Sequence, residues 1–79
     1  MMTHVALDCN EKNFSFSLRS KVWNCLDISR LLGEDIKRSL VEQLEISSEV
    51  TDGRLVCTIT CANGKVFQQM KSELERVLN

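Results

Sequence analysis

Residues 46–61 read ISSEVTDGRLVCTITC, which is two runs of alternating polarity on either side of Asp52-Gly53. Asp-Gly is a favoured pair for a two-residue type I′ turn, because both central positions of that turn need positive φ angles. The twist of a type I′ turn also matches the twist of the strands that it joins. The stretch therefore predicts a β-hairpin, which we expect over residues 45–61.

The length and charge of the chain restrict its class. Its 79 residues predict a single domain over residues 1–79. A chain of this size buries only about 60 % of its unfolded surface, so self-association or docking onto a larger partner would add stability. The net charge of −1 disfavours a nucleic-acid binder, because such proteins usually carry a basic stripe.

The sequence predicts a protein of the cytoplasm, or of the nucleus if the host is a eukaryote. Residues 1–8 lack both the basic region and the long apolar region of a secretory signal. No apolar run approaches the roughly 20 residues that a membrane-spanning helix needs, so we expect no membrane interaction.

A second hairpin is expected near the N-terminus. Apolar and polar residues alternate over residues 4–9 and again over residues 14–19, and the four polar residues 10–13 form a loop of hairpin length. The inward-facing residues of this hairpin are then Val5, Leu7, Cys9, Phe14, Phe16 and Leu18.

Two helical regions complete the prediction. From residue 27 apolar residues repeat at i+4 up to Leu44, and residues 66–78 repeat them at 3-4-3 spacing after a break at Asn63-Gly64. Gly33 either lies within the first helix or divides a short helix from a longer one. Residues 20–25 are compatible with a helix start and with an irregular crossover.

These elements predict an α+β fold of order ββαββα, with one antiparallel sheet and two helices packed on its apolar face. In the central hairpin, alternation places Ile46, Ser48 and Val50 on the helix side of the sheet. The outward face is then expected to carry His4, Asp8, Ser15, Ser17, Arg19, Ser47, Glu49, Thr51, Arg54, Val56, Thr58 and Thr60.

The spacing of the cysteines favours core packing over metal binding. Cys57 and Cys61 lie four strand residues, or roughly 13 Å, apart, whereas two thiolates on one zinc ion are at most about 4.6 Å apart. The same separation excludes a disulfide between them. We expect both, and also Cys9, to be buried reduced thiols, and Cys25 to be the most exposed thiol. A zinc-stapled module remains the alternative.

The sequence does not predict an enzyme. Its only histidine, His4, lies on the outward side of the first expected strand, too far from Asp8 for a direct hydrogen bond. A nucleophilic Ser or Cys needs a base beside it, and no such arrangement and no glycine-rich phosphate loop is visible. We therefore expect no catalytic residues, no cofactor and no metal.

The sequence favours a protein-interaction module that acts as an adaptor, an assembly subunit or an inhibitor, and a homodimer is compatible with it. Open antiparallel sheet edges can pair with another chain. Trp23 is compatible both with an interface anchor and with a cap over the core. The candidate partner-binding residues are Ser15, Ser17, Arg19, Trp23, Thr58 and Thr60.

The rival prediction is nucleic-acid binding through the hydroxyl-rich outward face. That face has no aromatic residue on which bases could stack. Contacts to phosphates would come from Arg19, Lys21, Lys37, Arg38 and Arg54.

Residues 45–79 also resemble, in layout, the tail of the small dimerising subunit of the KEOPS tRNA-modification complex. The shared elements are TDGR as the tight turn, LVCTITC as the next strand and ANGKVFQQMKSELERVL as the closing helix. The resemblance implies a non-catalytic subunit that dimerises and scaffolds a larger enzyme.

Overall fold

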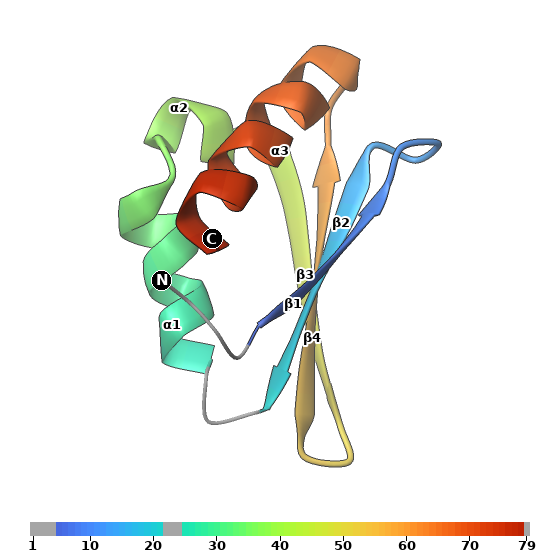
Figure 1. The fold of residues 1–79 in the computed structure, drawn as a ribbon, viewed down its shortest axis with the longest axis vertical. Coiled ribbons are helices and arrows are strands. Elements are labelled where there is room, and N and C mark those ends of the chain that lie inside the picture. The colour runs from blue at the N-terminus through green and yellow to red at the C-terminus, as the bar shows by residue number, and fades with distance from the viewer. Residues whose placement is uncertain (1–4, 22–24, 79) are drawn as a thin grey trace.

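The structure, a computed structural model, describes residues 5–21 and 25–78. It confirms the predicted α+β fold, with a four-stranded sheet and the helices on one side of it (Figure 1). The elements are β1 (Ala6–Asn10), β2 (Ser15–Lys21), α1 (Cys25–Arg30), the π-helical segment η2 (Leu31–Asp35), α2 (Arg38–Val41), β3 (Leu44–Thr51), β4 (Arg54–Cys61) and α3 (Gly64–Leu78).

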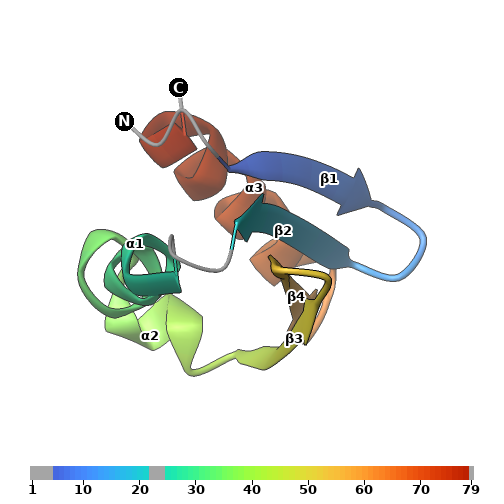
Figure 2. The ribbon, with the colours of Figure 1, turned by 90° about the horizontal axis from the view of Figure 1, so that it is seen from below.

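The strand order of the sheet is β1-β2-β4-β3, and every neighbouring pair is antiparallel. The two hairpins are therefore joined through their second strands, and β2 and β4 form the centre of the sheet. Strands β1 and β3 become its edges, and in Figure 2 no element lies beyond β3 on its outer side. Strand order thus decides which backbone groups have no partner in the sheet.

The central hairpin has the predicted turn. Asp52 has a φ angle of 53° and Gly53 a φ angle of 72°, the two positive values that a type I′ turn requires. The strands on either side pair from Thr51 opposite Arg54 onwards. The hairpin prediction is confirmed, with its first strand beginning one residue earlier than expected, at Leu44.

The first hairpin differs from the prediction at Phe14. Strand β2 begins at Ser15, and Phe14 occupies the turn with a φ angle of 51°. Its ring still lies on the helix side, 6.1 Å from the ring of Phe67, but 39 % of the residue is exposed. Its carbonyl oxygen accepts a hydrogen bond of 2.8 Å from the amide of Cys61, which joins the loop to the central strand β4.

The first helical region is two helical runs and not one continuous helix: α1 continues directly into η2, and α2 follows after a break. Gly33 lies in the middle of η2, and Ile36, in an extended conformation (φ −105°, ψ 137°), ends that segment. Gly33 therefore lies within a helical run, which is the first of its two predicted settings, and the break falls at Ile36 and Lys37. Ile28, Ile36 and Leu40 of the predicted i+4 repeat are buried, whereas Leu32 and Leu44 of that repeat are only partly buried. Leu31, beside the repeat, is also buried.

The closing helix begins two residues before the predicted start because Asn63 caps it. The side-chain oxygen of Asn63 accepts a hydrogen bond from the amide of Val66 at 3.0 Å, as N-cap residues do. On the buried face of α3, the ring of Phe67 stacks on that of Phe16 with a centroid distance of 4.6 Å and an interplanar angle of 10°. This stack joins α3 to the central strand β2.

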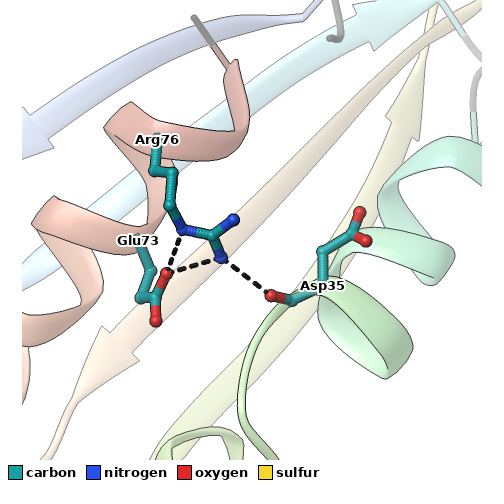
Figure 3. Close-up of polar contacts among 3 residues, drawn as sticks. All are labelled: Asp35, Glu73 and Arg76. Atoms are coloured by element: carbon teal, nitrogen blue, oxygen red, sulfur yellow. Dashed lines mark hydrogen bonds and ion pairs between the residues drawn. The ribbon is translucent and has the colours of Figure 1, made fainter.

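An arginine connects α3 with the first helical region (Figure 3). Arg76 Nε donates to Glu73 Oε2 at 2.8 Å, and Arg76 Nη2 lies 2.6 Å from the same oxygen. Arg76 Nη2 also donates to the backbone oxygen of Asp35 at 3.1 Å. The guanidinium thereby satisfies a carbonyl at the end of η2 from the neighbouring helix.

Candidate functional site

The sheet face turned away from the helices, here named the open face, is formed as the sequence predicts. In β2 and β4 alternate residues are buried on the helix side, and the residues between them are half-buried or exposed. Ser15 lies directly opposite Thr60. Ser17 lies directly opposite Thr58. The structure therefore brings four of the six candidate partner-binding residues into one block of hydroxyl groups at the centre of the sheet.

Arg19, the fifth candidate, lies beside this block in an ion pair. Its Nη2 is 2.8 Å from Asp8 Oδ2, and both side chains are more than half exposed. One step further along the open face, Lys21 lies directly opposite Arg54. Three basic residues thus gather at this end of the open face, and Arg19 among them pairs with Asp8 of the edge strand β1.

Two residues named from the sequence, Trp23 and His4, lie outside the described residues.

The outer strand β3 is exposed on both of its faces, which the sequence did not indicate. Ile46 and Val50 point to the helix side, because they lie opposite the buried Ile59 and Leu55. They are nevertheless 42 % and 58 % exposed. The helices cover β2 and β4, where alternate residues are buried, but leave β3 uncovered. Ile46 and Val50 therefore lie on the helix side as predicted, but no helix of the described residues packs over them, although the predicted fold implied one.

The free backbone groups of β3 follow from its hydrogen bonds with β4. The amide of Ala62 donates to the carbonyl of Gln43 at 3.2 Å, so odd-numbered residues of this strand turn their backbone groups toward β4. In an antiparallel pair these directions alternate along the strand. The N–H and C=O groups of Ile46, Ser48 and Val50 therefore point outward. We call this row of groups, with the strand that carries it, the β3 edge.

The other edge of the sheet is shorter and differently protected. Strand β1 has five residues, against eight in β3. It carries the Asp8–Arg19 ion pair on the open face. Beside it, Glu11 in the adjoining loop lies 3.5 Å from Lys71 Nζ on α3. Charged side chains of this kind blunt a sheet edge against pairing, so β3 is the more available of the two edges.

The predicted environment of the cysteines is confirmed at two positions and wrong at a third. Cys57 and Cys61 are buried, and burial raises the pKa of both thiols, while a hydrogen bond with Ser48 partly offsets the rise at Cys57. Cys9 is exposed, because it lies on the helix side of the edge strand β1, beyond the cover of the helices. The side chain of Cys25 lies outside the described part of the chain.

One concave surface lies between α2 and α3. It is a depression of about 420 Å³ lined mainly by polar side chains, among them Lys37, Gln69 and Glu73. Glu73 is already engaged by Arg76. Within residues 5–21 and 25–78, no three His, Cys, Asp or Glu side chains are grouped so that they could hold a metal ion.

None of the helices in the described ranges has the length and apolar character that crossing a membrane requires.

Comparison with known proteins gives no relative. No protein-family model, no curated protein and no solved structure matches this chain. The resemblance of residues 45–79 to the KEOPS subunit therefore stays a prediction from the sequence.

Proposed function

We propose that this protein is a non-enzymatic interaction module, an adaptor, assembly subunit or inhibitor, that binds a protein partner by strand addition at the β3 edge. The observation that carries the proposal is the exposure of this eight-residue edge strand on both faces. Its outward N–H and C=O groups form the template on which an extended segment of another chain adds to a sheet.

The side chains of β3 support binding at this edge. Natural proteins usually protect an edge strand with lysine, proline, a bulge or an inward-pointing charge. Strand β3 has none of these, and its only charged residues, Glu45 and Glu49, point to the open face. On the helix side it presents Ile46 and Val50, which an added strand would cover with its own apolar residues.

A proline substitution tests the proposal without removing a backbone hydrogen bond of the sheet, although it also deletes the hydroxyl of Ser48 that contacts Cys57. Ser48→Pro deletes one outward-pointing amide, and an edge strand tolerates proline at such a position. Cys9→Pro is the matched control. Cys9 is an exposed residue of the other edge strand, opposite Phe16, and the amide of Cys9 points outward from the sheet. In a nuclease-treated pull-down from host lysate, we expect Ser48→Pro to lose a stoichiometric partner that wild type and Cys9→Pro retain.

Equal capture by all three proteins, each verified as folded by circular dichroism, would overturn binding at the β3 edge. A Trp23→Ala variant in the same experiment tests the anchor predicted from the sequence. If the captured partner is a tRNA-modifying enzyme, the scaffolding role implied by the KEOPS resemblance gains its first direct support.

Nucleic-acid binding at the open face is the second candidate function. It is favoured by the position of Arg19, Lys21 and Arg54 at one end of the open face, because phosphate contacts are made by clustered basic side chains. Phosphate contacts would give an affinity for a fluorescent oligonucleotide that falls steeply with salt and is weakened by Arg54→Ala. Anisotropy that does not change with protein concentration at low salt would exclude this candidate.

A further inference from the structure

We infer that the β3 edge binds a second copy of this chain, with the two β3 strands antiparallel about a two-fold axis at Ser48. This inference rests on the proposed function of the edge and names its partner. The argument depends on which residues would face each other in each possible register.

Symmetry limits the registers that can form. When the two-fold axis is perpendicular to the sheet, the helices of both copies lie on one side and each face stays continuous. Residues directly opposite each other in an antiparallel pair point to the same face, so even-numbered residues must face even-numbered residues. Two registers meet this condition and pair seven residues of β3: one centred on Ser47, over residues 44–50, and one centred on Ser48, over residues 45–51.

The register centred on Ser47 is unfavourable on the open face and mixed on the helix side. On the open face it places Glu45 opposite the partner's Glu49, and symmetry repeats this pair. Like charges directly opposite each other destabilise a sheet. On the helix side it places Ile46 opposite the partner's Ser48, so an apolar side chain meets a hydroxyl, and Leu44 opposite the partner's Val50, which is an apolar pair. The charge repulsion on the open face therefore distinguishes this register from the one centred on Ser48.

The register centred on Ser48 pairs like with like on the helix side. Ile46 lies opposite the partner's Val50, and symmetry repeats this pair, while Ser48 lies opposite its own symmetry mate. Facing β-branched side chains are favourable cross-strand pairs. The apolar surface that is 42 % exposed at Ile46 and 58 % exposed at Val50 in one copy would then be shared between two.

The same register also separates the negative charges on the open face. Glu49 lies opposite the partner's Ser47. Glu45 lies opposite the partner's Thr51. Each carboxylate therefore faces a hydroxyl, and no two carboxylates face each other directly. The charge pattern of β3 thus complements its own antiparallel copy in one register and opposes it in the other.

The backbone groups fit the Ser48 register as well. Ile46, Ser48 and Val50 have outward N–H and C=O groups, and they are the residues that face one another in this pairing. Three donors from each copy give six hydrogen bonds across the axis. The result is a continuous sheet of eight antiparallel strands, four from each copy, with all helices on one side.

Charge substitutions at residue 47 distinguish this arrangement from its rivals. In the Ser48 register, a Ser47→Lys side chain faces the partner's Glu49 twice per dimer, and Ser47→Glu opposes it twice. We expect Ser47→Lys to lower the dimer Kd by about two- to thirty-fold and Ser47→Glu to raise it by a similar factor. Analytical ultracentrifugation measures both. Ser17→Lys, which places the same charge on the central strand β2, is the control and should leave the Kd unchanged.

Disulfide trapping gives a second, independent test of register. Facing residues with paired backbone groups have Cα atoms about 5.5 Å apart, which permits a disulfide. In a Cys9→Ser, Cys25→Ser background, an oxidised mixture of Ile46→Cys and Val50→Cys proteins should form a covalent heterodimer. Either variant alone should not, because residue 46 and its symmetry mate lie four positions, or about 13 Å, apart.

The outcomes separate this inference from the proposed function. A dimer that Ser47→Lys strengthens and that the mixed cysteine pair traps supports the inference. A dimer that both charges at residue 47 weaken has the Ser47 register, and a dimer indifferent to them uses another surface; either result overturns it. A chain that stays monomeric at all concentrations also overturns it. Loss of a different partner from Ser48→Pro would then leave the proposed function standing.

Discussion

The stacked pair of Phe16 and Phe67 provides a quantitative test of how α3 is held on the sheet. The rings lie 4.6 Å apart and nearly parallel, and both residues are 1 % exposed. Phe67 also contacts Phe14, but at 6.1 Å and a tilt of 51°, and Phe14 is 39 % exposed. We expect the free energy of unfolding to depend on the first pair more strongly than on the second.

The size of the expected effect decides which substitution to use. At about 0.05–0.15 kcal/mol per residue, a chain of this length has roughly 4–12 kcal/mol of stability. Replacing a buried phenylalanine by alanine lowers the free energy of unfolding by about 3–5 kcal/mol, which would leave little folded protein to measure. Leucine keeps more of the side-chain volume, and core changes of that size cost roughly 0.5–3 kcal/mol. Phe16→Leu and Phe67→Leu are therefore the appropriate variants.

A double-mutant cycle isolates the interaction between the rings. We expect a coupling free energy of about 0.5–1.5 kcal/mol for the Phe16–Phe67 pair, from urea unfolding followed by far-ultraviolet circular dichroism below the Kd of any dimer. The Phe14–Phe67 cycle, with Phe14→Leu, is the control and should give a smaller value. Additive changes at Phe16 and Phe67, within about 0.3–0.5 kcal/mol, or a larger coupling at Phe14, would refute this account of the core.

Three further predictions concern the turn, the helix cap and the thiols. Gly53→Ala should lower the free energy of unfolding, measured by urea unfolding, by about 1 kcal/mol, because Gly53 has a φ angle of 72°. Gly33→Ala should raise it by about 0.4–1 kcal/mol, because no atom lies within 4 Å of the added carbon. Asn63→Ala should cost about 0.5–2 kcal/mol in the same assay, and Asn63→Asp should keep the cap. Maleimide labelling of the native protein at neutral pH should modify Cys9 and spare Cys57. The free energy of unfolding should fall above about pH 9, because burial raises the pKa of Cys57, and its thiol then keeps a proton in the folded state that the unfolded chain releases.

Each of these predictions has a contradicting result. If alanine changed the free energy of unfolding equally at Gly53 and Gly33, the positive φ angle at the turn would not be the cause of the expected loss at Gly53. An Asn63→Asp variant as unstable as Asn63→Ala would remove the cap from the account. Labelling of Cys57 at the rate of Cys9, or stability that rises with pH above about 9, would contradict the burial of the core thiol.

Local chemistry made the hairpins and the closing helix predictable. Asp52-Gly53 decides the turn type from two residues, and the alternation around it decides which side of the sheet each neighbour faces. The block of hydroxyls on the open face followed for the same reason, because Ser17 and Thr58 lie on the polar positions of two clearly alternating strands. The face on which each residue lies depends only on residues near in sequence, whereas the contact of Ser17 with Thr58 also requires that β2 pairs with β4.

The features that could not be predicted depend on distant contacts. An i+4 apolar stripe is the same for one continuous helix and for two helical runs, so it could not predict the break at Ile36 and Lys37. Phe14 alternates with Phe16 in sequence but adopts a left-handed conformation, because its carbonyl pairs with Cys61 of the neighbouring strand. The exposure of Cys9 depends on strand order, which alternation does not encode.

The exposure of strand β3 depends both on local alternation and on the order of the strands in the sheet. Its alternation places Ile46 and Val50 on the helix side, yet strand order puts β3 at the edge, where the helices do not reach. A strand that only needed to face water on both sides would not require β-branched residues there. The same two residues face each other when the strand is paired with its own copy about Ser48, and that register is also the one that keeps the carboxylates apart. In the dimer that we propose, a second copy would cover the apolar half of the β3 pattern, which the single chain leaves exposed.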